Sequence, residues 1–104
     1  MAKILFEVDS RTMAALFAKV AEQVPRRAKH GERSFSLHVD DNARNVCYVL
    51  LEWESLPSAH RFLQAPVSQD LVAEWPIEKV LGAIPLYDLG EQLAAIKQEK
   101  RRDA

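Results

Sequence analysis

Cysteine and glycine are scarce in this chain of 104 residues. Its one cysteine, Cys47, excludes an intramolecular disulfide framework and any cysteine-rich zinc site. Three glycines are too few for a glycine-rich phosphate-binding loop. The three histidines, at positions 30, 38 and 60, lie too far apart for the short spacings typical of metal ligands. We therefore expect no metal site and no bound cofactor.

Long hydrophobic runs and an excess of charge are also missing. No apolar stretch approaches the roughly 20 residues that a membrane-spanning helix needs. Glu7 interrupts the N-terminal apolar run too early for a secretory signal. The net charge of −1 disfavours general binding to nucleic acid. The sequence thus predicts a cytoplasmic protein with neither a membrane nor a nucleic acid as partner.

The composition is that of a globular domain, with 48% hydrophobic and 28% charged residues. A chain of this length buries about two thirds of its unfolded surface, which is enough for a two-layer fold. We expect one domain over residues 1–89. A strongly charged tail, residues 90–104, is expected to be helical or disordered.

Alternating hydrophobicity predicts strands at residues 3–8 and 34–39, and an apolar run predicts a third at residues 46–53. The polar turn at residues 40–45 joins the last two as an antiparallel hairpin. Because Gly82 and Pro85 interrupt the final apolar stretch, a fourth strand is expected only over residues 86–89.

Two helical segments lie between these strands. Asp9 and Ser10 are capping residue types, and apolar residues then recur every three or four positions until Pro25, which should kink or end the helix. Ser55 and Pro57 open the second helix, which Pro66 interrupts. The order β-α-β-β-α-β predicts an α+β fold, the ferredoxin-like two-layer sandwich with an antiparallel sheet.

The two faces of this sheet differ in character. One face is wholly apolar, includes Cys47 and Trp53, and is expected to lie beneath the helices. The opposite face mixes polar and apolar residues: Leu5, Glu7, Ser36, His38, Tyr48, Leu50 and Glu52. This face is too apolar to be wholly exposed to water and too polar to lie in a core without water. Two such faces closing on each other would form a barrel around a small-molecule pocket, whereas the simpler alternative is one solvated sheet face.

The segment 48–66 carries a resemblance to a known superfamily. It contains the pair Glu52-Trp53 at a strand end, then Ala59 and Phe62, and then the break Ala65-Pro66. These features resemble the dimeric α/β-barrel superfamily, in particular the antibiotic biosynthesis monooxygenase-like proteins and relatives labelled cyclases. Residues 80–87 are similar to their final strand.

The resemblance implies a homodimeric barrel and cofactor-independent oxygenation, isomerisation or cyclisation of a small hydrophobic or aromatic molecule. Of the residues that the oxygenases use, Trp53 alone carries over. The haem-degrading members share an asparagine on the first strand, which this chain lacks, so haem degradation is not expected. The superfamily spans many chemistries, so the fold alone does not give the reaction.

The mixed face supplies the candidate site. Glu7 and His38 can form a general base with its orienting partner, and Glu52 is the third catalytic candidate. Tyr48, Ser36 and Leu50 are the candidate ligand-binding residues. The alternative is a hydrogen-bonded polar rim without a catalytic role. Trp53 is expected to pack in the core, and Cys47 to be a buried, inert thiol.

Two other functions remain open. A non-catalytic ligand-binding module or structural dimer would show ligand-linked stability without turnover. RNA-recognition motifs share this strand order, but they stack bases on several aromatic residues of the central strands. Here the third strand offers Tyr48 alone, and residues 40–78 hold seven acidic and two basic residues, which disfavours RNA binding.

Overall fold

The computed structural model describes residues 2–87, without the side chains at 43, 44 and 87. Its elements follow in the order β1 (Ala2–Asp9), α1 (Met13–Glu22), α2 (Val24–Ala28), β2 (Glu32–Asp40), β3 (Ala43–Trp53), α3 (Leu56–Gln64), α4 (Pro66–Ala73) and β4 (Lys79–Tyr87). The four strands form one antiparallel sheet in the order β2-β3-β1-β4. This confirms the ferredoxin-like α+β fold; the predicted tail lies outside the described residues.

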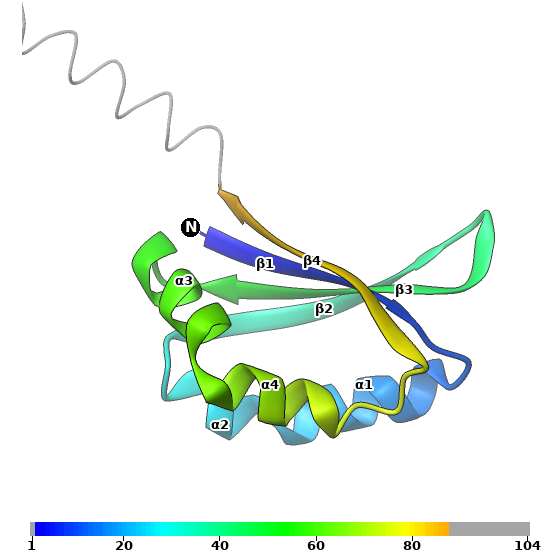
Figure 1. Ribbon diagram of the computed structural model, residues 1–104, viewed down its shortest axis with the longest axis horizontal. Coiled ribbons are helices and arrows are strands. Elements are labelled where there is room, and N and C mark those ends of the chain that lie inside the picture. Colours follow the sequence, from blue (N-terminus) through cyan, green and yellow to red (C-terminus); the bar gives the residue numbers. More distant parts are fainter. Residues whose placement is uncertain (1, 88–104) are drawn as a thin grey trace, which may run out of the picture.

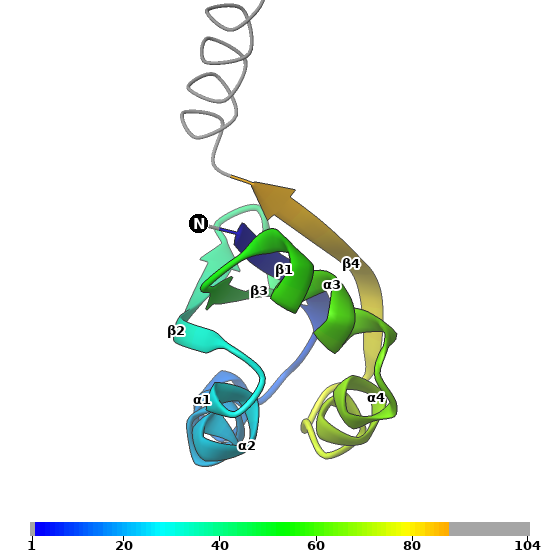
Figure 2. The ribbon, with the colours of Figure 1, turned by 90° about the vertical axis from the view of Figure 1, so that its left-hand side faces the viewer.

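The helices α1 to α4 cover the same face of the sheet (Figure 1). The second view shows α1 and α2 on the β2 side and α3 and α4 on the β4 side (Figure 2). Each βα unit therefore contributes one half of the helical layer. The opposite face of the sheet carries no helix of residues 2–87.

Proline divides the helices as the sequence predicts, and a glycine ends the first helical segment. Pro25 lies in the first turn of α2, where it separates this short helix from α1. Gly31, with a φ of 109°, ends this segment in a conformation that favours glycine. The Ser55 hydroxyl accepts a hydrogen bond from the Ser58 N–H at 3.2 Å and caps α3.

The predicted cap of α1 was wrong. The N-cap is Thr12, and its side chain makes no capping bond. Ser10 is buried instead, where its hydroxyl donates to the Pro76 carbonyl at 3.2 Å and accepts from the Thr12 N–H at 3.3 Å. Its hydroxyl thus ties the β1–α1 loop to the segment that precedes β4.

Strand β4 starts seven residues earlier than expected, at Lys79. It contains both Gly82 and Pro85, and its pairing with β1 shifts register between Glu7 and Val8. Among residues 2–87 it is an edge strand, so Pro85 needs no hydrogen bond on its outer side. The register shift accommodates one additional residue of β4, Leu81, which has no partner in β1. Gly82 and Pro85, which usually interrupt a strand, therefore do not prevent β4 from forming.

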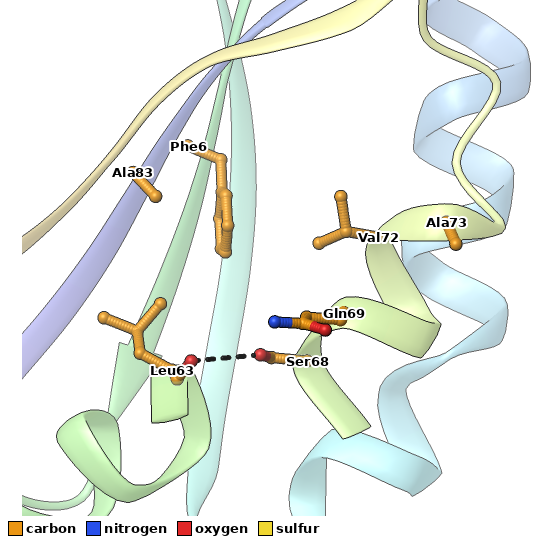
Figure 3. A pocket seen from close by; sticks show the side chains of 7 residues that line it. All are labelled: Phe6, Leu63, Ser68, Gln69, Val72, Ala73 and Ala83. Atoms are coloured by element: carbon orange, nitrogen blue, oxygen red, sulfur yellow. Dashed lines mark hydrogen bonds between the residues drawn. The ribbon is translucent and has the colours of Figure 1, made fainter. Parts of the chain in front are cut away.

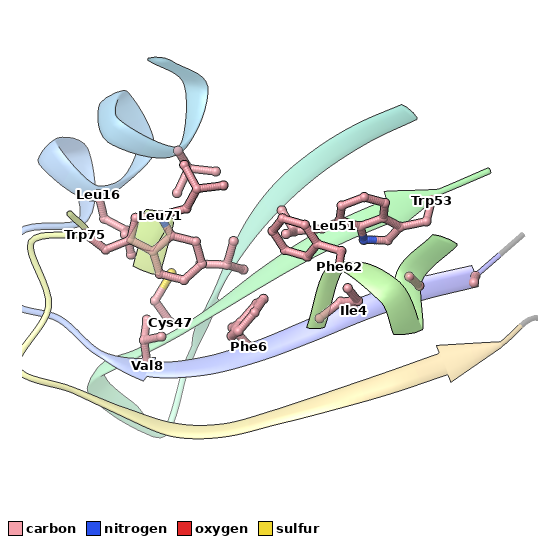
Figure 4. Packing of buried hydrophobic residues seen from close by; sticks show 14 residues of the cluster. Ile4, Phe6, Val8, Leu16, Cys47, Leu51, Trp53, Phe62, Leu71 and Trp75 are labelled. Carbon is pink, nitrogen blue, oxygen red and sulfur yellow. The ribbon is translucent and has the colours of Figure 1, made fainter. Parts of the chain in front are cut away.

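The apolar face forms the core beneath the helices. Every second residue of β1 is buried, and Trp53 is fully buried with its ring 4.6 Å from that of Phe62 (Figure 4). This confirms the predicted assignment of the faces. Val39 is the exception at 61% exposed, because the β2–β3 hairpin projects beyond the helices (Figure 1).

Candidate functional site

A pocket of about 400 Å³ lies between the helices α3 and α4 and the strands β1 and β4. Its lining residues are Phe6, Leu63, Ser68, Gln69, Val72, Ala73 and Ala83 (Figure 3). The volume falls in the range of small-molecule sites, which are mostly apolar with a few placed polar groups. The sequence did not single out this site, because Phe6, Leu63 and Val72 follow the ordinary pattern of core residues.

Two polar side chains line this pocket. The Ser68 hydroxyl donates to the carbonyl of Ala65, the N-cap of α4, at 3.0 Å and to the carbonyl of Leu63, in α3, at 3.3 Å. Gln69 is exposed on α4 and extends toward Leu63 (Figure 3). Its amide has no hydrogen-bond partner in the described part of the chain. Gln69 therefore offers a donor and an acceptor to a ligand.

A buried network of hydrogen bonds supports the wall of the pocket. Phe6 packs edge-to-face on Trp75, with ring centroids 5.2 Å apart. The Trp75 indole N–H donates to the Gln23 amide oxygen at 2.7 Å, and the Gln23 amide donates to the Leu71 carbonyl at 2.9 Å. The position of Phe6 thus depends on groups that never touch the pocket.

Arg27 extends this hydrogen-bond network toward the sheet. Its side chain is fully buried, and its Nε donates to Glu32 at 2.8 Å. Its other nitrogens donate to the Val20 carbonyl at 2.8 Å and to Gln23 at 3.4 Å. Burial raises the pKa of Glu32, and the hydrogen bond and charge of Arg27 act in the opposite direction.

The predicted site residues lie on the face away from the helices. Their register places His38 beside Tyr48, and Tyr48 beside Glu7. Glu7 and His38 are therefore two strands apart, and the direct pair expected between them is not formed within one chain. The His38 ring instead shares a hydrogen bond of 2.9 Å with the Ser36 hydroxyl.

The remaining predicted residues also have ordinary partners on this face. The Tyr48 hydroxyl donates to Asp40 at 3.3 Å. Desolvation and the nearby negative charges of Asp40 and Glu7 raise the pKa of Tyr48. Glu52 lies 3.9 Å from the Lys3 ammonium group. Leu50 stands between Ser36 and Leu5 in the next row of the sheet.

None of the six predicted residues lines the pocket beside Gln69. Cys47 is buried, and this burial raises the pKa of its thiol, as expected for an inert cysteine. Within the described range no three His, Cys, Asp or Glu residues gather as metal ligands. No helix there is long and apolar enough to cross a membrane.

Comparison with solved structures identifies the architecture. An antibiotic biosynthesis monooxygenase-like protein of Bordetella bronchiseptica superimposes with a TM-score of 0.68 at 15% identity, covering 85% of this chain and 96% of that one. This chain has the fold of that protein. A similar protein of Chloroflexus aurantiacus gives a TM-score of 0.59 at 17% identity, covering 85% and 92% of the two chains.

The Nitrosomonas europaea protein of the same description gives a TM-score of 0.57 at 10% identity, covering 86% of this chain and 99% of that one. The predicted resemblance is thus confirmed at the level of the fold. No family model matches the chain, and no curated protein does. At these identities the likeness carries no catalytic residue from one protein to the other.

Proposed function

We propose that this protein binds a small, uncharged hydrophobic or aromatic molecule in the pocket between α3, α4 and the sheet. There it would support cofactor-independent oxygenation, isomerisation or cyclisation. The observation that carries the proposal is the lining itself, which is apolar apart from Ser68 and the free amide of Gln69. An uncharged ring with one hydroxyl or carbonyl group matches such a surface.

The lining also limits the chemistry. None of its seven described residues carries a group that titrates near neutral pH, so a reaction here would rely on an ionisable group of the substrate, such as a phenol. The same observation favours a second function, ligand binding without turnover. Catalysis would produce a new compound from the bound molecule, whereas a binding module would only gain thermal stability.

Binding of 1-naphthol tests the proposal. Phe6 joins the pocket to Trp75, so we expect a saturable change in tryptophan fluorescence. Gln69→Leu removes one hydrogen bond, worth about 1 kcal/mol, and should raise the Kd about fivefold. Val72→Trp should fill the pocket and abolish binding.

Gln64→Leu is the matched control, because Gln64 is exposed on α3 and does not line the pocket. Its Kd should equal that of the wild type. A Kd that is the same in all of these proteins would refute this location of the binding site.

The free face of the sheet supports a homodimer as part of the same proposal. Leu5 lies between Leu50 and Ile84 in one row of the sheet, and Ile84 is 52% exposed. Leu86 follows in the next row. A second copy that covers this face would bury about 1,500 Å² in total, the size of a stable interface. The catalytic role predicted for Glu7, His38 and Glu52 depends on such a dimer to enclose them.

Sedimentation equilibrium at micromolar concentration tests the dimer. We expect a mass of twice 11.8 kDa for the wild type. Ile84→Lys should give a monomer, because it places a charge within the apolar row. Ala18→Lys adds the same charge on an exposed position of α1 and should remain dimeric. A wild-type monomer at this concentration would contradict the barrel.

A further inference from the structure

A second pocket, of about 320 Å³, lies where the turn after α2 meets the start of α3. Its lining residues are Lys29, His30, Glu54, Ser58, Arg61, Phe62 and Ala65. It shares no residue with the pocket beside Gln69 and is far more polar. Three of its seven residues are basic and one is acidic.

Several basic residues near this pocket have carboxylate partners. Arg26 makes two hydrogen bonds to Glu74, at 2.8 and 2.9 Å. Arg27 is paired with Glu32, as described above. Lys29, in the same basic segment, has no carboxylate within 4.0 Å among residues 2–87. Its charge is therefore unmatched at the pocket.

Two further basic side chains reach the pocket, Arg61 from α3 and His30 from the turn. Neither has a carboxylate partner in the described chain. The acidic lining residue, Glu54, lies 3.8 Å from Arg33, which stands outside the pocket and partly offsets its charge. The pocket therefore holds a net positive charge.

The backbone holds these groups together. The Glu54 N–H donates to the Gly31 carbonyl at 2.9 Å, which fixes the turn bearing Lys29 and His30 beside the start of α3. The His30 ring lies 6.2 Å from that of Phe62. Phe62 in turn packs on Trp53 in the core (Figure 4). The pocket thus combines cations on its rim with an aromatic ring in its wall.

We infer that this pocket binds the phosphate group of a small phosphate monoester, whose apolar part lies against Phe62 and Ala65. A phosphate monoester carries nearly two negative charges at neutral pH and accepts hydrogen bonds from several donors. Lys29, Arg61 and His30 provide such donors from two sides, and charge-assisted bonds of this kind are the strong ones. The Ser58 hydroxyl is not among them, because it donates to the Ser55 carbonyl at 2.9 Å.

Phenyl phosphate is the probe for this site, titrated at low ionic strength with backbone amide NMR and tryptophan fluorescence. We expect saturable shifts at His30 and Arg61, and a fluorescence change through Phe62 and Trp53. Phenyl phosphate should bind more tightly than inorganic phosphate, because the ring adds apolar contact. Phenol, which lacks the charge, should leave these amides unshifted.

Matched variants separate a specific site from general attraction. Arg61→Gln and Lys29→Gln should each raise the Kd at least about tenfold, the effect of losing one charge-assisted hydrogen bond. Arg11→Gln removes the same charge at an exposed position outside the pocket and should change the Kd less than about twofold. Equal Kd values for Arg61→Gln and Arg11→Gln would overturn the site, as would shifts confined to other amides.

Discussion

Replacing Arg27 with methionine tests the buried hydrogen-bond network behind the candidate pocket. Methionine keeps the length of the apolar stem but removes the guanidinium group. The change breaks the 2.8 Å bonds to Glu32 and to the Val20 carbonyl and the longer bond to Gln23. One oxygen of Glu32 already lacks a hydrogen-bond partner, so the variant leaves its buried carboxylate without a side-chain partner among residues 2–87.

The cost follows from this burial. Both side chains of the pair are almost fully shielded, at 0% and 2% exposed, and removing one partner of such a pair costs about 3–5 kcal/mol. Domains of this size are stable by about 5–15 kcal/mol. At about 4–8 °C per kcal/mol, the Tm of Arg27→Met should fall by roughly 12–40 °C.

The stability deficit should also depend on pH. Burial raises the pKa of Glu32, and loss of Arg27 should raise it further. A carboxyl whose pKa is higher in the folded than in the unfolded protein stabilises at low pH and loses this contribution as the pH rises through the folded pKa. The deficit of Arg27→Met should therefore grow from pH 4 to pH 7. Adding Glu32→Leu removes the unpaired charge and should restore part of the Tm.

Thermal and urea unfolding, followed by circular dichroism and tryptophan fluorescence, provide the measurement. Arg26→Met is the matched control, because its pair with Glu74 is exposed to solvent and should contribute far less. If Arg27→Met melts within about 2 °C of the wild type, or if the double variant is no more stable than the single one, the buried pair does not support the fold.

Two further predictions concern the core and the free face of the sheet. Trp53→Ala should cost about 3–5 kcal/mol in urea unfolding, as for other buried aromatic residues; a change below about 1 kcal/mol would contradict the packing of Trp53 on Phe62. Since His38 and Glu7 lie outside the pocket beside Gln69, His38→Ala and Glu7→Gln should preserve the dimer in sedimentation and the Kd for 1-naphthol, and should abolish turnover only if the dimer encloses a catalytic site on the free face. Unchanged turnover in both variants would exclude a catalytic role for the free face.

Local signals in the sequence predicted most of the fold correctly. Sorting the strand residues by parity identified the buried face, because a strand presents successive side chains to opposite sides wherever it lies. Pro25 marked the helix break, because its backbone constraint acts within a single turn. The start of β4 was missed, since pairing with β1 outweighs the weak strand preference of Gly82 and Pro85.

The candidate site could be predicted only in part. The sequence placed Glu7 and His38 on the same face, which is correct, but it could not show that Tyr48 separates them, because strand order is set by long-range pairing. It likewise could not distinguish Arg26, exposed beside Glu74, from its neighbour Arg27, buried with Glu32. That difference depends on which side of a short helix faces the sheet.

The sequence by itself therefore determined the order of the elements, the two faces of the sheet and the burial of Trp53 and Cys47, since these depend on the period of hydrophobic residues along the chain. Tertiary structure alone decided where the pockets lie, because Gln69 meets Phe6 and Arg61 meets Lys29 only after distant segments pack together. Cavities form between helices and strands, and the hydrophobic periodicity of one element does not show which side chains of another element will lie opposite it.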